Sequence, residues 1–236
     1  MRYIVKRLEP LEGKSLIDIG SGLGEASVYF SLRGADVTAA DISPEMLLFA
    51  QKLALRYKTR LRTYLGMAED VNPGQKFDVI YAGNLLHHVN IRETLVKVKK
   101  IMHPESTFIS WDPLAYNPVI NIYRKIARRV RTRDEHPLTK RDIQLIREHF
   151  GEVNLRFFWL TTLIIFITMA IVQWRNPNRV RYWKKVVEEG NKWSWIYRPL
   201  EQFDNFLLRR VPILRWLCWN VVIEAKKPVL TNDSSK

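Results

Sequence analysis

A short glycine-rich segment has the composition of a ligand-binding turn. It reads Asp18-Ile19-Gly20-Ser21-Gly22-Leu23-Gly24 and lies between an apolar run that favours a strand and a segment with helical spacing. Glycine lets a backbone turn tightly and lets a ligand approach main-chain N–H groups at the start of a helix. Asp41 ends the next apolar run, where a carboxylate can accept hydrogen bonds from both hydroxyls of a ribose. The pattern predicts a nucleoside site. The alternative is that the glycines only let the chain turn.

Other nucleotide-binding and metal-binding patterns do not fit the sequence. A phosphate-binding loop needs Gly-Lys-Ser/Thr, which is absent, and a dinucleotide-binding turn needs Gly or Ala where Glu25 stands. Cys218 is the only cysteine, so the chain cannot form an internal disulfide or a cysteine-built zinc or iron–sulfur site. No cluster in the sequence has the spacing of metal ligands, and we expect no metal.

The residues around the turn alternate between strand and helix patterns. Strands are expected at 15–19, 36–40, 61–65, 77–82 and 107–111, and helices at 25–33, 43–54 and 92–102. Ser43 is a good N-cap for the second of these helices, and Pro44 suits its first helical position. Further helices are expected at 115–133 and 139–149, and a last strand at 216–225. This alternation predicts an α/β fold with a doubly wound, mainly parallel sheet.

Several segments carry a combined resemblance to one enzyme family. They are the turn from Asp18 to Gly24, Ala40-Asp41-Ile42-Ser43 with the following Pro44-Glu45-Met46-Leu47, Gly66-Met67-Ala68-Glu69-Asp70, Phe77–Asn84, Leu85-Leu86-His87-His88-Val89 and the late Trp219–Pro228. Together they resemble motifs of the class I S-adenosylmethionine-dependent methyltransferases, most closely over residues 13–112. The resemblance implies a Rossmann-like sheet of seven strands, mainly parallel, with an antiparallel final strand beside the fifth.

The resemblance also implies a cofactor, S-adenosylmethionine, and roles for individual residues. Asp41 would hold the ribose, Asp70 would face the adenine amino group, and Met67 or Ala68 would pack on the adenine ring. The full set of residues implied to bind the cofactor is Asp18, Gly20, Ser21, Gly22, Gly24, Asp41, Ile42, Met46, Met67, Ala68, Glu69, Asp70, Asn84 and Leu85. Because a sulfonium methyl donor is reactive without help, the protein mainly has to supply position and a shielded site.

Three histidines are candidate catalytic residues that accept a proton. His87 and His88 follow the expected fourth strand, and His136 lies in a polar loop after the fifth. A histidine at either place could take a proton from a hydroxyl, phenol or amine as the methyl group arrives. The alternatives are that the paired histidines cap or pack the next helix and that His136 is a surface residue.

Positive charge and apolar residues concentrate in the second half of the chain. Residues 1–118 hold 15 Lys and Arg against 13 Asp and Glu, whereas residues 119–236 hold 23 against 11. The second half also contains Phe157–Trp174, 18 residues without a charge. As a helix this run would rise about 27 Å, just short of the roughly 30 Å of a bilayer's hydrocarbon core.

Two interpretations of the uncharged run are open. Either residues 156–160 form the sixth strand and a shorter helix dips into a membrane interface, or the run is buried in the protein or in a dimer. Basic runs at 124–133 and 175–185, with Trp174, Trp183, Trp193, Trp195 and Trp216 among or near them, favour an anionic lipid surface. RNA or DNA would explain the charge but not the uncharged run, and residues 83–86 lack the Asn/Asp-Pro-Pro-Tyr/Phe motif of base-methylating enzymes.

We therefore expect a methyltransferase core at 1–159 and 216–228, a helical, membrane-facing insertion at 160–215 and a polar tail at 229–236. The expected function is methylation of a hydrophobic or lipid-like small molecule at the membrane surface. The alternatives are a soluble O- or N-methyltransferase for natural products with the insertion as a homodimer interface, an RNA methyltransferase, and a cofactor-binding protein without catalysis. Nothing reads as a secretory signal, so the expected location is the cytoplasm with peripheral membrane association.

Overall fold

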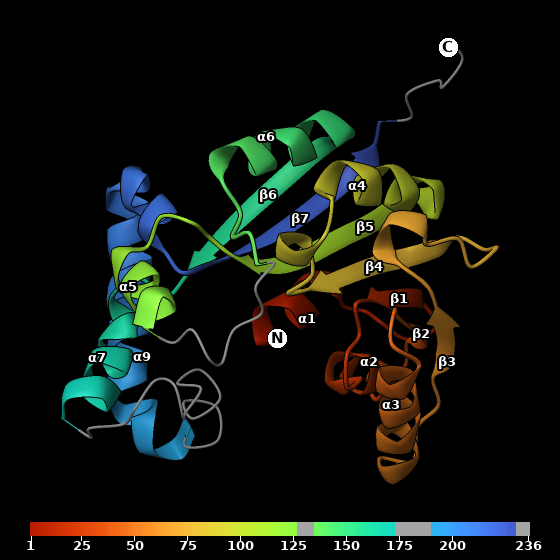
Figure 1. The fold of residues 1–236 in the computed structure, drawn as a ribbon, viewed down its shortest axis with the longest axis horizontal. Coiled ribbons are helices and arrows are strands. Elements are labelled where there is room, and N and C mark those ends of the chain that lie inside the picture. The colour runs from red at the N-terminus through yellow and green to blue at the C-terminus, as the bar shows by residue number, and fades with distance from the viewer. Residues whose placement is uncertain (127–134, 173–189, 230–236) are drawn as a thin grey trace. The chain divides into compact units, whose positions relative to one another are not determined.

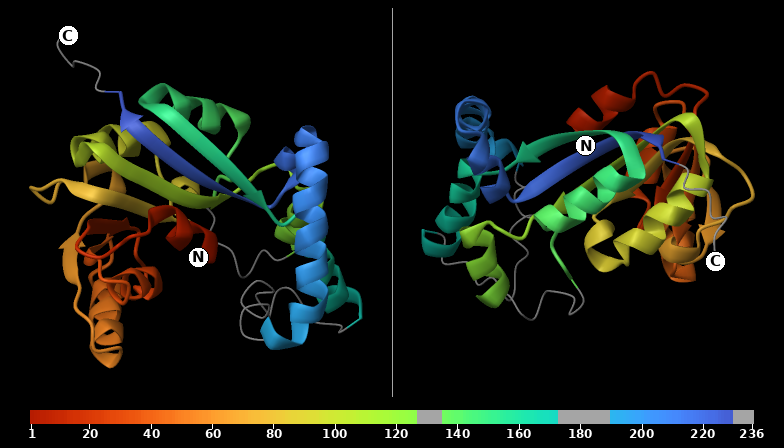
Figure 2. Two further views of the ribbon diagram at one scale, coloured as in Figure 1. Left: turned by 180° about the vertical axis from the view of Figure 1, so that it is seen from behind. Right: turned by 90° about the horizontal axis from the view of Figure 1, so that it is seen from above.

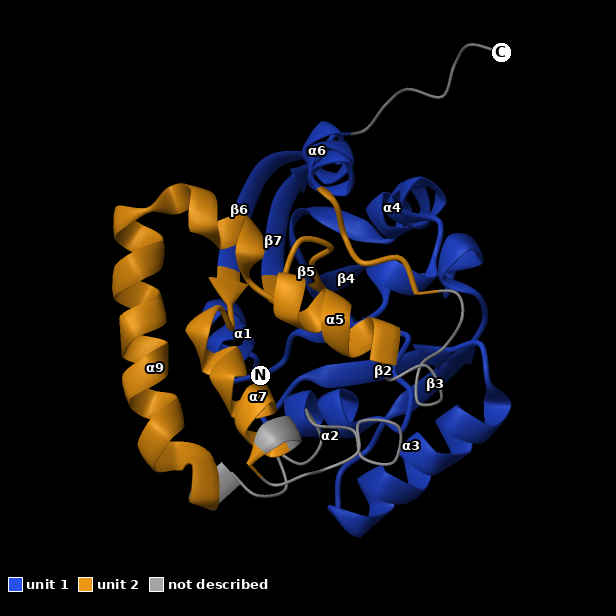
Figure 3. Ribbon diagram, turned by 60° about the vertical axis from the view of Figure 1, so that its left-hand side comes forward, with its two compact units in different colours: residues 1–112, 140–156, 222–236 blue, residues 113–139, 157–221 orange. Residues whose placement is uncertain are grey.

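The computed structural model describes residues 1–126, 135–172 and 190–229. They fall into two compact units, which Figure 3 colours separately. The first unit consists of Met1–Asp112, Lys140–Arg156 and Val222–Lys236, and the second of Pro113–Thr139 and Phe157–Val221. The domain boundaries expected at 160 and 215 stay a prediction. Most of both basic runs, Trp174, Trp183 and nearly all of the polar tail lie outside the described residues.

A seven-stranded sheet runs in the order β3-β2-β1-β4-β5-β7-β6 (Figure 1). Its strands are β1 (Ser15–Ile19), β2 (Asp36–Asp41), β3 (Arg62–Leu65), β4 (Phe77–Gly83), β5 (Met102–Pro113), β6 (Phe150–Phe158) and β7 (Asn220–Pro228). The pairs β3–β2, β2–β1, β1–β4 and β4–β5 are parallel, and the final strand lies antiparallel beside the fifth. The predicted Rossmann-like sheet is confirmed.

Helices cover the sheet of the first unit. They are α1 (Arg2–Leu8), α2 (Glu25–Ser31), α3 (Pro44–Arg56), α4 (Ile91–Lys100) and α6 (Lys140–His149). Figure 2 shows α4 and α6 on one face of the sheet and α1 on the other. Side-chain caps fix the starts of two helices. Ser43 caps α3 by accepting a hydrogen bond from Met46 N, and Asn90 caps α4 by accepting one from Glu93 N.

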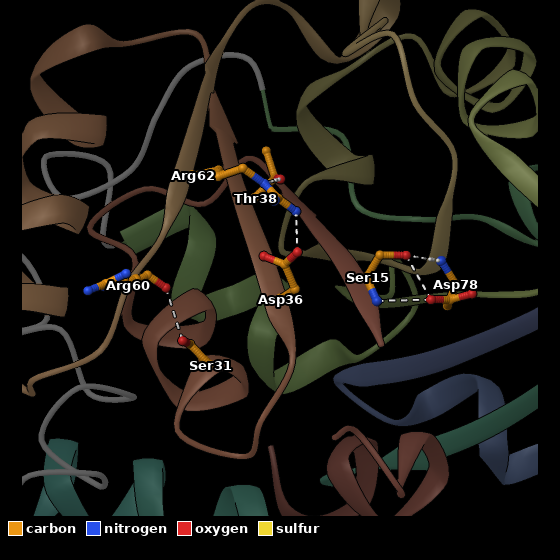
Figure 4. Close-up of polar contacts among 7 residues, drawn as sticks. All are labelled: Ser15, Ser31, Asp36, Thr38, Arg60, Arg62 and Asp78. Carbon is orange, nitrogen blue, oxygen red and sulfur yellow. Dashed lines mark hydrogen bonds and ion pairs between the residues drawn. The ribbon is translucent and has the colours of Figure 1, made fainter. Parts of the chain in front are cut away.

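Burial of apolar residues and polar contacts between strands stabilise the centre of the sheet. In β1 the four residues from Leu16 to Ile19 are all buried, as expected for a strand covered on both faces. At the starts of the strands, polar side chains join neighbours (Figure 4). Ser15 Oγ donates to Asp78 Oδ2 over 2.7 Å between β1 and β4, and Arg62 pairs with Asp36 at 2.6 Å between β3 and β2.

The helix predicted at 92–102 is wrong at its end. It stops at Lys100, and Met102 begins β5 opposite Phe77. The last turn carries Lys97, Lys99 and Lys100, which suit a helix C-terminus, whereas Met102 is buried in the sheet.

The N-terminal helix was not predicted, because seven residues are too few to show a clear period. It buries Ile4, Val5 and Leu8. Arg7 makes two hydrogen bonds, of 2.7 and 2.9 Å, to the carboxylate of Glu224 on β7. Glu224 is 2% exposed, so this pair fixes α1 against a buried charge.

The second unit is helical in its described part. It contains α5 (Pro118–Ile126), the short turn η4 (Thr161–Leu163), α7 (Ile164–Ile171), α9 (Gly190–Arg210) and the turn η5 (Pro212–Leu217). Their shared core consists of Ile120, Leu163, Ile165, Phe166, Met169 and Trp193.

The described part of the uncharged run, residues 157–172, is divided between three elements. It supplies the end of β6, then η4 and α7, and four of its side chains enter the core of the second unit: Leu163, Ile165, Phe166 and Met169. The eight residues of α7 rise only about 12 Å. Among the described helices, none has the length and apolar character needed to cross a bilayer.

We expect Arg7→Met to lower the free energy of unfolding by about 1–3 kcal/mol, because it removes the bidentate partner of a buried carboxylate. Arg62→Met is the matched control: its pair with Asp36 is exposed on both sides, and its loss should cost under about 1 kcal/mol. Urea unfolding followed by circular dichroism measures both, and equal losses would contradict the role of the Glu224 pair.

Candidate active site

A cavity of about 510 Å³ opens at the carboxyl ends of β1, β4 and β5. This is the edge where parallel α/β sheets bind ligands, and the volume lies within the roughly 300–1,000 Å³ usual for small-molecule sites. The lining residues are Met1, Asp18, Gly20, Ser21, Leu23, Glu25, Ala26, Tyr29, Tyr81, Gly83, Asn84 and Trp111. All of them belong to the first unit.

The glycine turn has the geometry that its sequence predicts. Gly20 and Gly24 have φ values of +73° and +78°, in the region that other residues rarely adopt. A Cβ on Gly20 would lie 2.8 Å from the Leu85 side chain, and a Cβ on Gly24 would collide with Ala50 of α3. Gly20 thus keeps the cavity wall open, and Gly24 lets α2 and α3 pack closely.

Asp41 ties the turn to the neighbouring strand. Its Oδ2 accepts a hydrogen bond from Gly22 N at 2.8 Å, and its Oδ1 accepts one from Ser43 N at 2.9 Å. The residue is half-buried and is not among the lining residues of the cavity. Each carboxylate oxygen has a second lone pair, so Asp41 can still accept hydrogen bonds from a ligand.

Asp18 is a buried acid in the lining of the cavity. Its side chain is 1% exposed, and its Oδ2 accepts a hydrogen bond of 2.5 Å from Ser27 Oγ. Burial raises the pKa of Asp18 from 3.8 to about 7, the bond from Ser27 opposes this shift, and the charge of Asp41 adds to it. A cation in the cavity would favour the ionised form.

Residues implied to hold an adenine lie outside the cavity lining. Ala68, Glu69 and Asp70 form the short turn η1 (Ala68–Asp70) after β3. Glu69 accepts a hydrogen bond from Asn90 N, and Asp70 pairs with Lys97 at 3.0 Å. Three large apolar residues that are also implied to bind the cofactor are exposed, at 66%, 37% and 49%: Ile42, Met46 and Met67.

The paired histidines have different surroundings in the turn η2 (Leu86–His88) that follows β4. His87 is buried, and its Nδ1 lies 2.8 Å from Asp112 Oδ1, while His88 is exposed. Their rings are 4.0 Å apart, centroid to centroid. Asp112 is fully buried at the end of β5, and its Oδ2 has no hydrogen-bond partner in the described structure.

Of the residues predicted for the site, Asp18, Gly20, Ser21 and Asn84 line the cavity. Gly22, Gly24, Asp41 and Leu85 adjoin those residues in the chain or by the contacts above. His136 is exposed in the second unit.

Three aromatic residues of the cavity, Tyr29, Tyr81 and Trp111, were not predicted from the sequence. For Tyr81 and Trp111 the signal in the sequence was an aromatic residue near the carboxyl end of an expected strand. In the described ranges, no group of three His, Cys, Asp or Glu residues could hold a metal ion.

The raised pKa of Asp18 predicts a pH-dependent stability. Between pH 4 and 7 the folded chain keeps this group protonated while the unfolded chain ionises it, so its contribution is lost as the pH rises. Asp18→Asn should therefore gain stability relative to wild type over this range, with a slope of up to about 1.4 kcal/mol per pH unit.

Chemical unfolding at several pH values, followed by fluorescence, measures the difference between variant and wild type. Asp36→Asn, at an exposed acid of the same sheet, controls for the loss of one charge. A difference that stays constant from pH 4 to 7 would show that Asp18 ionises normally.

Comparison with known proteins identifies a methyltransferase domain. Residues 17–110 match the family described as a methyltransferase domain. The chain is 34% identical over 85 residues to a ubiquinone biosynthesis O-methyltransferase from Azorhizobium caulinodans, covering 36% of this chain and 34% of that protein. A protein of the same name from Vibrio atlanticus is 31% identical over 108 residues, covering 44% of this chain and 45% of that one. The chain thus spans less than half the length of these relatives.

Solved structures share the fold. TehB from Haemophilus influenzae matches with a TM-score of 0.53 at 16% identity, over 68% of this chain and 55% of that one. The magnesium protoporphyrin IX methyltransferase ChlM from Synechocystis, solved with bound SAH, matches with a TM-score of 0.53 at 18% identity, over 66% and 74%. Residues 17–110 of this chain are thus a methyltransferase domain, and the match supports the resemblance to the class I S-adenosylmethionine-dependent methyltransferases and S-adenosylmethionine as the cofactor.

Proposed function

We propose that this protein methylates a hydrophobic, lipid-like small molecule at a membrane surface, with S-adenosylmethionine as the methyl donor. The observation that carries the methyl transfer is the cavity beside the glycine turn, with Asp18 and Ser21 in its lining and Asp41 bonded to the turn. A lipid-like acceptor is supported by the names of the relatives, ubiquinone biosynthesis O-methyltransferases. The basic, aromatic character of the second half supports the membrane surface.

The residues of the cavity suit this cofactor. Ser21 Oγ is buried without a hydrogen-bond partner in the described structure, so a polar ligand can satisfy it. Gly20 leaves room where any side chain would press on Leu85. The carboxylate of Asp18 can balance a positive charge, and aromatic rings such as Tyr81 and Trp111 also attract cations. When bound, S-adenosylmethionine supplies a methyl group carried on a positively charged sulfur.

We assign the binding roles along the strand ends. Asp41 accepts hydrogen bonds from the ribose hydroxyls through the lone pairs that Gly22 and Ser43 leave free. The register pairs Asp41 with Leu65, so Ile42 and Met67, which follow these strand ends, lie at the same edge of the sheet. Their exposed side chains, with Met46, offer an apolar surface for a flat base. Glu69 and Asp70 supply acceptors for its amino group.

We assign proton acceptance to His87, with Asp112 as its positioning residue. The Asp112 carboxylate next to Nδ1 holds the ring in place, which leaves Nε2 to accept a proton. The acceptor oxygen would receive the methyl group from the sulfonium of the cofactor and would lose its proton to His87. His88 and His136 are the competing assignments, and the test below compares all three.

Calorimetric titration with S-adenosylmethionine tests the cofactor site. Asp41→Ala should weaken binding about tenfold or more, because it removes the acceptors for the ribose hydroxyls. Asp36→Ala changes an acid at the other end of the same strand and should leave the affinity within about twofold. Equal affinities for wild type and Asp41→Ala would refute the ribose contact.

Methyl transfer from labelled S-adenosylmethionine to a short-chain polyprenyl phenol tests the histidine. His87→Gln should lower kcat about 10²- to 10⁴-fold, because it removes the proton acceptor, with cofactor affinity retained. Asp112→Asn should lower kcat less and shift its pH profile, as a positioning residue would. A larger loss in His88→Gln or His136→Gln than in His87→Gln would move the role to that residue.

A further inference from the structure

Helix α9 presents two contrasting sides. Its inner side is held by Trp193, Asp204 and Leu208, each at most 8% exposed. The Asp204 carboxylate accepts hydrogen bonds from Leu160 N at 3.0 Å and from Thr161 N at 2.8 Å. These bonds cap the turn η4 and fix which side of α9 faces the core of the second unit.

The opposite side of α9 is aromatic and exposed. Trp195, Phe203 and Phe206 are 73%, 51% and 56% exposed. At about 100° per residue, Phe203 and Phe206 fall within about 80° of Trp195 around the helix, whereas the three inner residues point away from it. The chain continues into exposed apolar residues at the turn that follows, where Ile213 is 72% exposed.

Positive charge shares this outer side. The exposed charged residues of α9 are all basic: Lys192, Arg198, Arg209 and Arg210. Its two acids are turned away, since Asp204 is buried and Glu201 is half-buried and accepts a hydrogen bond from Tyr197. The Arg210 guanidinium lies 5.3 Å from the centre of the Phe206 ring. Large aromatic residues mixed with Lys and Arg suit the headgroup region of an anionic bilayer.

We infer that the outer side of α9, with Trp195, Phe203 and Phe206 and their four basic neighbours, is the surface by which this chain binds anionic membranes. The inference deepens the proposed function, on which it rests for the membrane setting. It places membrane contact on α9 instead of on the uncharged run at 157–174, much of which is core. A second copy of the chain is a poorer partner, because apposing two such sides would bring eight like charges together.

Co-sedimentation of the full chain with phospholipid vesicles tests the inference. Vesicles that contain one third phosphatidylglycerol should bind wild type, and vesicles of phosphatidylcholine alone should bind far less. The double variant Phe206→Ser/Arg210→Glu should lower binding to the anionic vesicles at least about tenfold, because it removes an apolar anchor and reverses a charge.

The matched control is Phe49→Ser/Lys52→Glu on α3. It changes another exposed Phe with a cation 5.8 Å from its ring, and it should leave vesicle binding within about twofold. Thermal unfolding by circular dichroism confirms that both double variants fold. Equal binding by the two variants, or equal binding of wild type to neutral vesicles, would overturn the inference. Sedimentation velocity without lipid would also overturn it by showing a wild-type dimer that the α9 variant loses.

The methyl-transfer assay separates this inference from the proposed function. Vesicle binding that depends on Phe206 and Arg210, in a chain that methylates no phenol, would support the α9 surface and refute the proposed activity. Methylation of a soluble short-chain phenol by a chain that ignores anionic vesicles would support the activity and refute the α9 surface.

Discussion

The hydrogen bond from Gly22 N to Asp41 joins the turn after β1 to the last residue of β2, and the site depends on it. The donor belongs to the turn after β1 and the acceptor ends β2, so the bond sets the position of the turn against the neighbouring strand. Parallel pairing of β1 with β2 and β4 brings the carboxyl ends of all three strands to one edge. That alignment places the cavity, the carboxylates of Asp18 and Asp41, and the histidines of η2 at the same edge of the sheet.

Two carboxylates at this edge have different surroundings and therefore different tasks. Asp41 is half-buried and receives two main-chain N–H donors. Burial raises the pKa of Asp18 to about 7, although the hydrogen bond from the Ser27 hydroxyl opposes this shift. An acid that is close to half-ionised at neutral pH can respond to a cation placed beside it, whereas Asp41 offers fixed acceptors. A third acid, Asp112, lies 2.8 Å from the imidazole of His87 and also accepts a hydrogen bond from His87 N, and so extends the site toward proton transfer.

The sequence predicts the features that depend on local patterns. The glycine turn, the Ser43 cap and the alternation of strands and helices depend on neighbouring residues, and the structure has all three. Contacts between residues that are far apart in the sequence could not be predicted from it. The pairing of His87 with Asp112 spans 25 residues, and no spacing rule connects them. The same limit applies to Arg7 and Glu224, and to the inner and outer sides of α9, because Asp204 reads as one more surface acid until its bonds to Thr161 are seen.

The most direct measurement of the central claim is a crystal structure of the chain with S-adenosylhomocysteine. We expect a ribose whose hydroxyls lie within hydrogen-bond distance of Asp41, with the amino-acid part of the ligand beside Gly20 and Ser21. A nucleoside bound at any other edge of the sheet, or a ribose with no contact to Asp41, would contradict it.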